Sequence, residues 1–128
     1  MVKGIGIDMV EIGRVRRILD RESGSAFERR TFTEAEQAEA KTRPDAASYY
    51  AARFAAKEAV FKAIGPLTPS KSFDLRIVET LNREDGSPYV NCTEQLIPLL
   101  DAAGVTTLHI SITDEGDYAA AFVVACGE

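Results

Sequence analysis

The spacing of apolar residues predicts a long helix in the middle of the chain. At about 100° per residue, large apolar side chains gather on one stripe and alanines gather on the opposite side. The large residues are Tyr50, Phe54, Val60, Phe61 and Ile64, and the small ones are Ala52, Ala56, Ala59 and Ala63. A helix that is apolar on two sides is typically buried. We expect this helix to follow Asp45 as its N-cap and to end at Pro66.

A strand pattern opens the sequence. In the segment 2–10, one face carries Ile5, Ile7 and Met9, and the other carries Gly4, Gly6 and Asp8. The glycines allow either close backbone packing or space for a ligand. Asp8 therefore ends a strand on a face that has no side chains beside it. The glycine spacing is not that of a dinucleotide-binding motif, which argues against a Rossmann fold.

Helix and turn signals fill the rest of the first half. Residues 11–21 are predicted to form a helix, followed by a Gly/Ser break at 23–25. Thr33 and Glu36 have the spacing of a capping box and should start a short polar helix that stops before Arg43. The loop Pro66–Ser72 is rich in proline and serine, which predicts a mobile lip after the central helix.

The second half has mostly strand periodicity. Residues 73–78 alternate, turn residues follow at 84–88, and residues 89–92 complete a predicted hairpin. Residues 94–103 form a weaker predicted helix, interrupted by Pro98 and closed by Gly104. Residues 108–113 alternate, a polar turn is expected at 114–117, and 118–126 is a nearly continuous apolar strand. The pattern predicts an α+β fold, an antiparallel sheet with a long central helix, in one domain of residues 1–128.

Composition narrows the class of protein. The chain has 128 residues, 45% hydrophobic and 27% charged, and no apolar run approaches the ~20 residues of a membrane span. We therefore expect no membrane partner. No secretory signal is apparent, and Cys92 and Cys126 lack metal or redox spacing. Buried thiols are favoured over a disulfide, and a reducing cytoplasm is the expected location.

Charge is unevenly distributed. The formal net charge of −5 argues against nucleic acid as a partner. However, the window 14–30 holds six arginines and only three acidic residues. Arg14, Arg17 and Arg21 recur at i, i+3 and i+7 on one side of the first predicted helix. Such a basic face indicates an acidic protein or a phosphorylated small molecule as partner, or else a simple solvated helix face.

Two carboxylates stand in predicted settings too apolar for an idle charge. These are Asp8 at its strand end and Glu58 on the central helix. Mg²⁺ prefers oxygen ligands and takes only one or two carboxylates from protein, leaving positions for water and phosphate. Lys62 lies one turn beyond Glu58, and Arg53 and Lys57 precede it, so donors suited to phosphate oxygens accompany the predicted ligands. The alternative is that Glu58 and Lys62 form an ordinary helix ion pair.

These motifs resemble a known family. The segments GIGIDMVEIGRV, RFAAKEAVFKAIG, FDLRIVE with GSPYV, and HISITDEGDYAAAFVVA are similar to those of holo-acyl-carrier-protein synthases, the short bacterial 4′-phosphopantetheinyl transferases. The resemblance runs nearly end to end. It implies transfer of 4′-phosphopantetheine from coenzyme A to a serine of an acyl carrier protein, with Mg²⁺, in a homotrimer whose active sites lie between subunits.

The resemblance also assigns roles to residues. It implies that Asp8 and Glu58 bind the metal and that Lys62 neutralises phosphate charge during catalysis. Arg53 and His109 match positions that contact the nucleotide part of coenzyme A, although His109 is equally explained as a hydrogen-bonded sheet residue. The helix with Arg14, Arg17 and Arg21 resembles the docking surface for the carrier protein.

Two positions depart from the family pattern. Family members usually carry a histidine where this chain has Asp114, and many have a Gly-Thr-Gly turn where this chain has Gly65–Pro69. Asp114 is therefore a candidate proton acceptor in place of an imidazole, alongside another carboxylate or metal-bound water. Two alternatives remain open: a non-catalytic relative that keeps the trimer and the carrier-binding surface, and an unrelated Mg²⁺-dependent phosphohydrolase.

Overall fold

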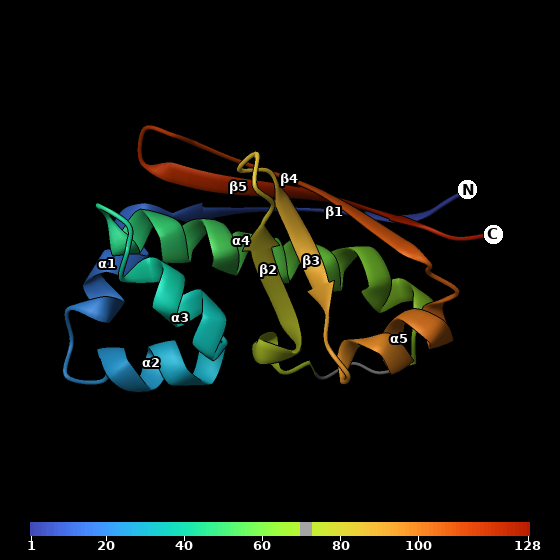
Figure 1. Cartoon of the computed structure of the whole chain (residues 1–128), viewed down its shortest axis with the longest axis horizontal. Coiled ribbons are helices and arrows are strands. Elements are labelled where there is room, and N and C mark those ends of the chain that lie inside the picture. The colour runs from blue at the N-terminus through green and yellow to red at the C-terminus, as the bar shows by residue number, and fades with distance from the viewer. Residues whose placement is uncertain (70–72) are drawn as a thin grey trace.

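A computed structural model describes residues 1–69 and 73–128 (Figure 1). In chain order the elements are β1 (Val2–Glu11), α1 (Ile12–Leu19), α2 (Gly24–Thr31), α3 (Glu34–Ala40), α4 (Ala46–Ile64), η1 (Gly65–Leu67), η2 (Leu75–Ile77), β2 (Val78–Asn82), β3 (Pro88–Cys92), α5 (Leu96–Ala103), β4 (Thr107–Glu115) and β5 (Tyr118–Cys126). The predicted α+β class with a long central helix is confirmed. No helix in the described ranges is long and apolar enough to cross a membrane.

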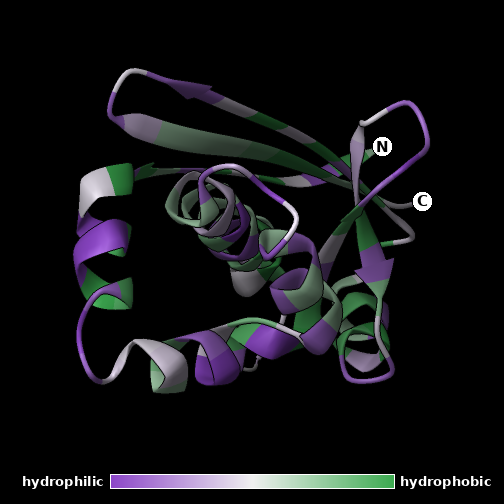
Figure 2. Ribbon diagram, turned by 60° about the vertical axis from the view of Figure 1, so that its left-hand side comes forward, coloured by the Kyte–Doolittle hydropathy of each residue, from purple (hydrophilic) through white to green (hydrophobic). Residues whose placement is uncertain are grey.

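The long helix α4 lies across one face of an antiparallel sheet with strand order β1-β5-β4 (Figure 1). Figure 2 shows α4 between this sheet and the helices of the N-terminal half. The hairpin β2–β3 forms a second sheet that crosses α4. The three-stranded sheet therefore has two edge strands, β1 and β4.

The glycines of β1 serve close backbone packing. A Cβ on Gly4 would lie 2.1 Å from the carbonyl oxygen of Ala63, and one on Gly6 would lie 1.9 Å from that of Ala59. Both distances are far shorter than atoms tolerate, so only glycine lets β1 rest directly on α4. The alanine side of α4 is the matching surface. Of the two explanations for this glycine face, backbone packing is therefore the one the structure supports.

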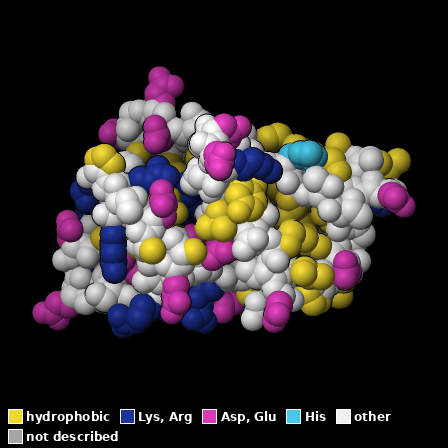
Figure 3. All heavy atoms as spheres, in the orientation of Figure 1, with side chains coloured by type: hydrophobic (Ala, Val, Ile, Leu, Met, Phe, Trp, Pro, Cys, Tyr) yellow, Lys and Arg dark blue, Asp and Glu magenta, His cyan; other side chains and the backbone are white. Residues whose placement is uncertain are grey.

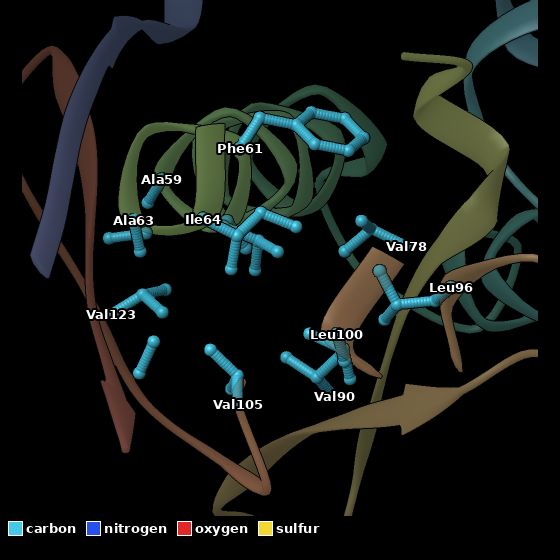
Figure 4. Close-up of a cluster of buried hydrophobic side chains, with 14 of the residues drawn as sticks. Ala59, Phe61, Ala63, Ile64, Val78, Val90, Leu96, Leu100, Val105 and Val123 are labelled. Carbon is cyan, nitrogen blue, oxygen red and sulfur yellow. The ribbon is translucent and has the colours of Figure 1, made fainter. Parts of the chain in front are cut away.

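Two apolar clusters fill the molecule. One joins the C-terminal half of α4 to the hairpin, α5 and β5, and Figure 4 shows Ile64, Val78, Leu100 and Val123 converging there. The other joins α1, α2 and α3 to the N-terminal half of α4. Its centre is aromatic, with the Phe32 and Tyr50 ring centroids 4.3 Å apart. These two clusters pack against opposite halves of α4.

Capping residues fix the helix starts as predicted. Thr33 and Glu36 form the expected capping box, and the carboxylate of Asp45 accepts a hydrogen bond from the backbone N–H of Ala47. Asp45 also accepts two hydrogen bonds from Arg16, at 2.9 and 3.0 Å. Hydrogen bonds from Arg16 and Ser48 lower the pKa of Asp45. The start of α4 is thereby tied to α1.

Several boundaries differ from the predictions. The Gly/Ser break is the start of α2, which the sequence reading missed, and α1 ends at Leu19, so Arg21 lies in the turn beyond it. Residues 75–77 form η2 rather than a strand, since the side chain of Asp74 caps this turn. Pro98 does not interrupt α5. It lies in the first turn, where a backbone N–H has no intrahelical partner in any case.

Two further differences concern loops and thiols. β4 continues to Glu115, so the turn is shorter than predicted and Asp114 belongs to a strand. Cys92 is exposed and Cys126 half-buried, so Cys92 is not the buried thiol expected; both are free. In the predicted loop Pro66–Ser72, the first residues belong to η1, and residues 70–72 lie outside the described ranges.

A fully buried ion pair connects four elements of this fold, α3, α4, η2 and β2. Lys57 of α4 and Glu36 of α3 are 0% exposed and lie 2.7 Å apart. The Lys57 ammonium also donates to the carbonyl oxygens of Leu75, at 3.0 Å, and of Val78. Glu36 accepts from the backbone N–H of Thr80 at 3.0 Å. Lys57 therefore points into the core and is not the phosphate donor that the sequence suggested.

We expect removal of one member of this pair to be strongly destabilising. Lys57→Met leaves Glu36 buried without its cation, which should lower the free energy of unfolding by about 3–5 kcal/mol. Urea denaturation measures this loss. Arg17→Ala, which breaks an exposed 3.4 Å pair with Glu11, is the control and should cost about 1 kcal/mol or less. Equal losses in the two variants would contradict the structural role of the buried pair.

Candidate active site

Three of the predicted site residues meet at the β1 edge of the sheet. The Lys62 ammonium donates to the Asp8 carboxylate at 2.9 Å and to the carbonyl oxygen of Ile7 at 3.1 Å. Glu58, one turn before Lys62 on α4, is half-buried beside them. The close approach of β1 to α4 brings these side chains together, because Asp8 follows the two glycines on the same face of the strand.

The carboxylates of this cluster influence one another. Burial raises the pKa of Glu58, and the nearby charge of Asp8 raises it further, while Lys62 acts in the opposite direction. A carboxylate whose ionisation is disfavoured by burial and by a neighbouring carboxylate gains from a cation that both can bind. Within the described ranges no group of three or more His, Cys, Asp or Glu side chains is placed to hold a metal. A two-carboxylate site fits Mg²⁺, which takes its other ligands from water and phosphate.

A cavity of about 480 Å³ opens next to this cluster. Asp8, Glu58 and Arg14 line its polar end. Its apolar wall comes from α1, α2 and α4 and includes Ile18, Phe27 and Phe54. A long, mostly apolar substrate with one charged end has complementary surfaces here.

A second cavity, of about 390 Å³, lies at the opposite side of α4. It is bounded by the N-terminal half of α4, the hairpin β2–β3 and the end of β4. Arg53, only 5% exposed, donates to the side-chain oxygen of Asn82 at 2.7 Å, and its guanidinium lies 4.8 Å from the centre of the Tyr49 ring. Arg43 approaches the same ring at 5.1 Å. Two arginines thus converge on one cavity.

The remaining predicted residues are dispersed within the chain. Asp114 lines the Arg53 cavity, apart from Asp8 and Glu58. His109 is exposed on the outer face of β4, which faces away from α4; Figure 3 shows this histidine at the surface. A single copy of the chain therefore brings Asp8, Glu58 and Lys62 together, and Arg53 and Asp114 together, but it does not unite these two groups or add His109 to either.

The three arginines predicted to form a docking face are exposed. Arg14 lines the cavity at Asp8 and Glu58, and Arg17 makes its weak exposed pair with Glu11. Arg21 is exposed in the turn after α1. The basic surface therefore borders the cavity that holds the paired carboxylates.

Three residues of the second cavity were missed by the sequence reading. Arg43, Tyr49 and Asn82 come from a loop, from α4 and from the end of β2. The only available signal was the i, i+4 spacing of Tyr49 and Arg53, which places a ring beneath a guanidinium on one helix face. Asn82 gave no signal, because its role depends on where the hairpin crosses α4.

Paired carboxylates beside a lysine at one edge, and two arginines at the other, are typical of a protein that binds a phosphorylated ligand with a divalent cation. Comparison with known proteins identifies the family within this class. A family model described as "4'-phosphopantetheinyl transferase superfamily" matches residues 4–123. The chain belongs to this superfamily.

Named relatives agree with the resemblance found in the sequence. The holo-[acyl-carrier-protein] synthase of Myxococcus xanthus is 39% identical over 96% of this chain and 94% of its own. The crystal structure of the synthase from Neisseria meningitidis superposes with a TM-score of 0.87 at 34% identity, covering 98% of each chain. The Bacillus anthracis synthase, solved in complex with coenzyme A (3′,5′-ADP), has a TM-score of 0.79 at 31% identity and covers 100% of this chain and 99% of its own.

The raised pKa of Glu58 makes a prediction about stability and pH. In the metal-free protein, the folded state holds the Glu58 proton more tightly than the unfolded state does. The ionised carboxylate should therefore destabilise the fold increasingly as the pH rises above the unfolded value of about 4.3. We expect Glu58→Gln to raise the melting temperature at neutral pH and to have little effect below about pH 4. Thermal unfolding in a chelating buffer, followed across this range, tests the direction; a lower melting temperature at neutral pH would contradict it.

Proposed function

We propose that this protein transfers the 4′-phosphopantetheine group of coenzyme A to a serine of an apo acyl carrier protein, with Mg²⁺ held by Asp8 and Glu58. The observation that carries the proposal is the cluster of these two carboxylates with Lys62, in a chain of the phosphopantetheinyl transferase superfamily. In this reaction the serine oxygen forms a bond to the phosphorus that carries pantetheine. The pyrophosphate P–O bond breaks, and 3′,5′-ADP leaves.

The residues of the cluster suit this displacement. Bound between Asp8 and Glu58, Mg²⁺ would supply positive charge to the pyrophosphate oxygens. Lys62 already lies within hydrogen-bond distance of Asp8 and can turn its ammonium toward a phosphate, since its side chain is 54% exposed. The apolar cavity beside the cluster offers space for the pantetheine arm. Positioning and charge neutralisation should supply most of the rate acceleration.

The two separated groups of residues support an active site shared between copies. The outer face of the sheet exposes Ile5, Ile7 and Met9 at 61–64%, together with Tyr118 and Phe122. So large an apolar face favours burial against another protein surface. We infer a homotrimer in which this face is covered, and in which the Arg53 cavity of one copy completes the Asp8 and Glu58 site of the next. Arg53, and His109 from the outer face, would then contact the nucleotide part of coenzyme A.

Carrier-protein recognition follows from the basic surface beside the same cavity. Arg14, Arg17 and Arg21 are exposed cations in an otherwise acidic protein, and an acidic carrier helix is a complementary partner. The cytoplasm remains the proposed location, consistent with two free thiols. A non-catalytic relative is less well supported, because a pure binding module gains nothing from crowding Asp8 and Glu58 together.

Transfer by the purified protein is the direct test. Incubated with coenzyme A, Mg²⁺ and a panel of apo carrier proteins, it should add the phosphopantetheine mass to at least one carrier, as read by mass spectrometry. Asp8→Ala and Glu58→Ala should each abolish transfer while leaving a folded protein, since each removes a predicted metal ligand and relieves a crowded charge. Asp101→Ala, which removes an exposed carboxylate from α5, should transfer normally. Full activity in either site variant would refute the metal assignment.

Asp114 provides a separate prediction about proton transfer. If Asp114 accepts the serine proton, Asp114→Asn should slow turnover by roughly 10²–10⁴-fold. Asp114→His should restore much of the rate, with the acidic limb of the kcat/KM profile moved toward about pH 6.5. Steady-state rates across a pH series measure both effects. Near-normal turnover of Asp114→Asn would leave this role to metal-bound water or another carboxylate.

A further inference from the structure

Arg53 is a buried cation without a carboxylate partner among the described residues. Its neighbour on α4, Lys57, is equally buried but is paired with Glu36. Arg53 instead donates to the neutral side chain of Asn82 at 2.7 Å and lies over the Tyr49 ring, while its Nε atom has no hydrogen-bond partner. A buried charge held in this way is costly unless a ligand supplies the missing anion.

The hydrogen bonds of Asn82 fix the orientation of its amide. The side-chain oxygen faces the guanidinium of Arg53, and Arg43 approaches the same oxygen at 3.5 Å. The side-chain nitrogen donates to the carbonyl oxygen of Gly86 at 2.8 Å, in the turn of the same hairpin. If the amide were flipped, its NH₂ group would face the arginine N–H donors and its oxygen would face the carbonyl oxygen of Gly86. Only the observed orientation is therefore favourable. Asn82 thus holds Arg53 in place from the hairpin.

The amide of Asn82 holds Arg53 without neutralising its charge, whereas a carboxylate at this position would neutralise it. Aspartate would pair with Arg53 and neutralise it, and its second oxygen would face the Gly86 carbonyl, acceptor against acceptor. Other carboxylates near the cavity leave Arg53 unpaired. Glu39 pairs with Arg43 and Asp45 pairs with Arg16, and in the described ranges Asp114 forms no salt bridge with either arginine of the cavity. Arg53 therefore keeps its full charge for a ligand.

We propose that Asn82 is a positioning residue for substrate specificity: it fixes Arg53 without neutralising it, so that the cavity selects the ribose 3′-phosphate of coenzyme A. This inference rests on the proposed function. There, the pyrophosphate is assigned to the Asp8 and Glu58 cluster, which leaves the phosphate monoester as the anion for a second cationic cavity. The Arg53 guanidinium lies 4.8 Å from the centre of the Tyr49 ring and is held by Asn82. A guanidinium fixed in this way offers its remaining N–H donors as a planar fork, the geometry that phosphate oxygens accept.

The test compares coenzyme A with 3′-dephospho-coenzyme A, which lacks only this phosphate. For the wild-type protein, KM for the dephospho substrate should exceed that for coenzyme A by roughly tenfold to a hundredfold, the cost of losing charge-assisted hydrogen bonds. Asn82→Asp should raise KM for coenzyme A toward the dephospho value and leave kcat within about threefold, since the defect lies in substrate binding rather than in chemistry. The KM ratio between the two substrates should therefore collapse.

Two further variants separate positioning from charge and from folding. Asn82→Leu has a similar shape but cannot accept from Arg53, so the KM ratio should fall to an intermediate value; it also decides the question if Asn82→Asp does not fold. Asn91→Asp is the charge control, because it adds the same charge to β3 of the same hairpin. Asn91 donates to Glu79 at 2.9 Å and is not the residue that holds Arg53, so this variant should keep the wild-type KM ratio between the two substrates. Melting temperatures confirm that the variants compared are folded.

Each outcome discriminates. A wild-type protein that transfers from both substrates with equal KM overturns the inference while the proposed function stands. The same holds if Asn82→Asp and Asn82→Leu retain the wild-type ratio, or if Asn91→Asp loses it equally. Failure of the wild-type protein to modify any carrier from either substrate would overturn the proposed function, and this inference with it.

Discussion

The buried pair of Lys57 and Glu36 fixes the arrangement on which the rest of the structure depends. It joins α3 to α4 and, through Leu75, Val78 and Thr80, it holds the start of the hairpin against the same helix. An ammonium and a carboxylate at 0% exposure are costly without their partners, so the pair favours the one crossing of the hairpin over α4 that satisfies both. That crossing brings the end of β2 over Arg53. The pair is assigned no part in the proposed chemistry, and yet it helps to form one of the two cavities.

Helix α4 is the common support for both groups of functional residues. Glu58 and Lys62 face β1, whereas Arg53 faces the hairpin and the end of β4. Each group sits at a different edge of the sheet that covers the helix. A chain built in this way gives one half of a site on each side and presents an apolar sheet face beside them, an arrangement suited to repeated association of identical copies.

The sequence predicted most of the elements and the grouping of Asp8 with Glu58 and Lys62. Asp8 and Glu58 were recognisable because alternation put Asp8 beside two glycines and helical spacing put Glu58 beside Lys62. Lys57 was wrongly interpreted as a phosphate donor. The helical pattern shows that its side chain points inward, but it does not show that Glu36, recognised only as a capping residue, is its buried partner. The surroundings of His109 depend on which face of β4 is exposed, and those of Asn82 depend on where the hairpin crosses α4. Both are properties of the tertiary structure. Helix α2 was missed because Gly24 and Ser25, read as a break, are its first residues.

The contact of Gly4 and Gly6 with α4 has a consequence for the motion of the site. Because main chain rests on main chain there, no rotamer of an intervening side chain can change the separation of β1 from the helix. The two segments that carry Asp8 and Glu58 should move as one rigid body on the timescale of side-chain fluctuations. Exchange of the β1 amides that are hydrogen-bonded to β5 is then expected to require separation of the sheet from α4, so that the carboxylates lose their mutual arrangement only when the protein unfolds.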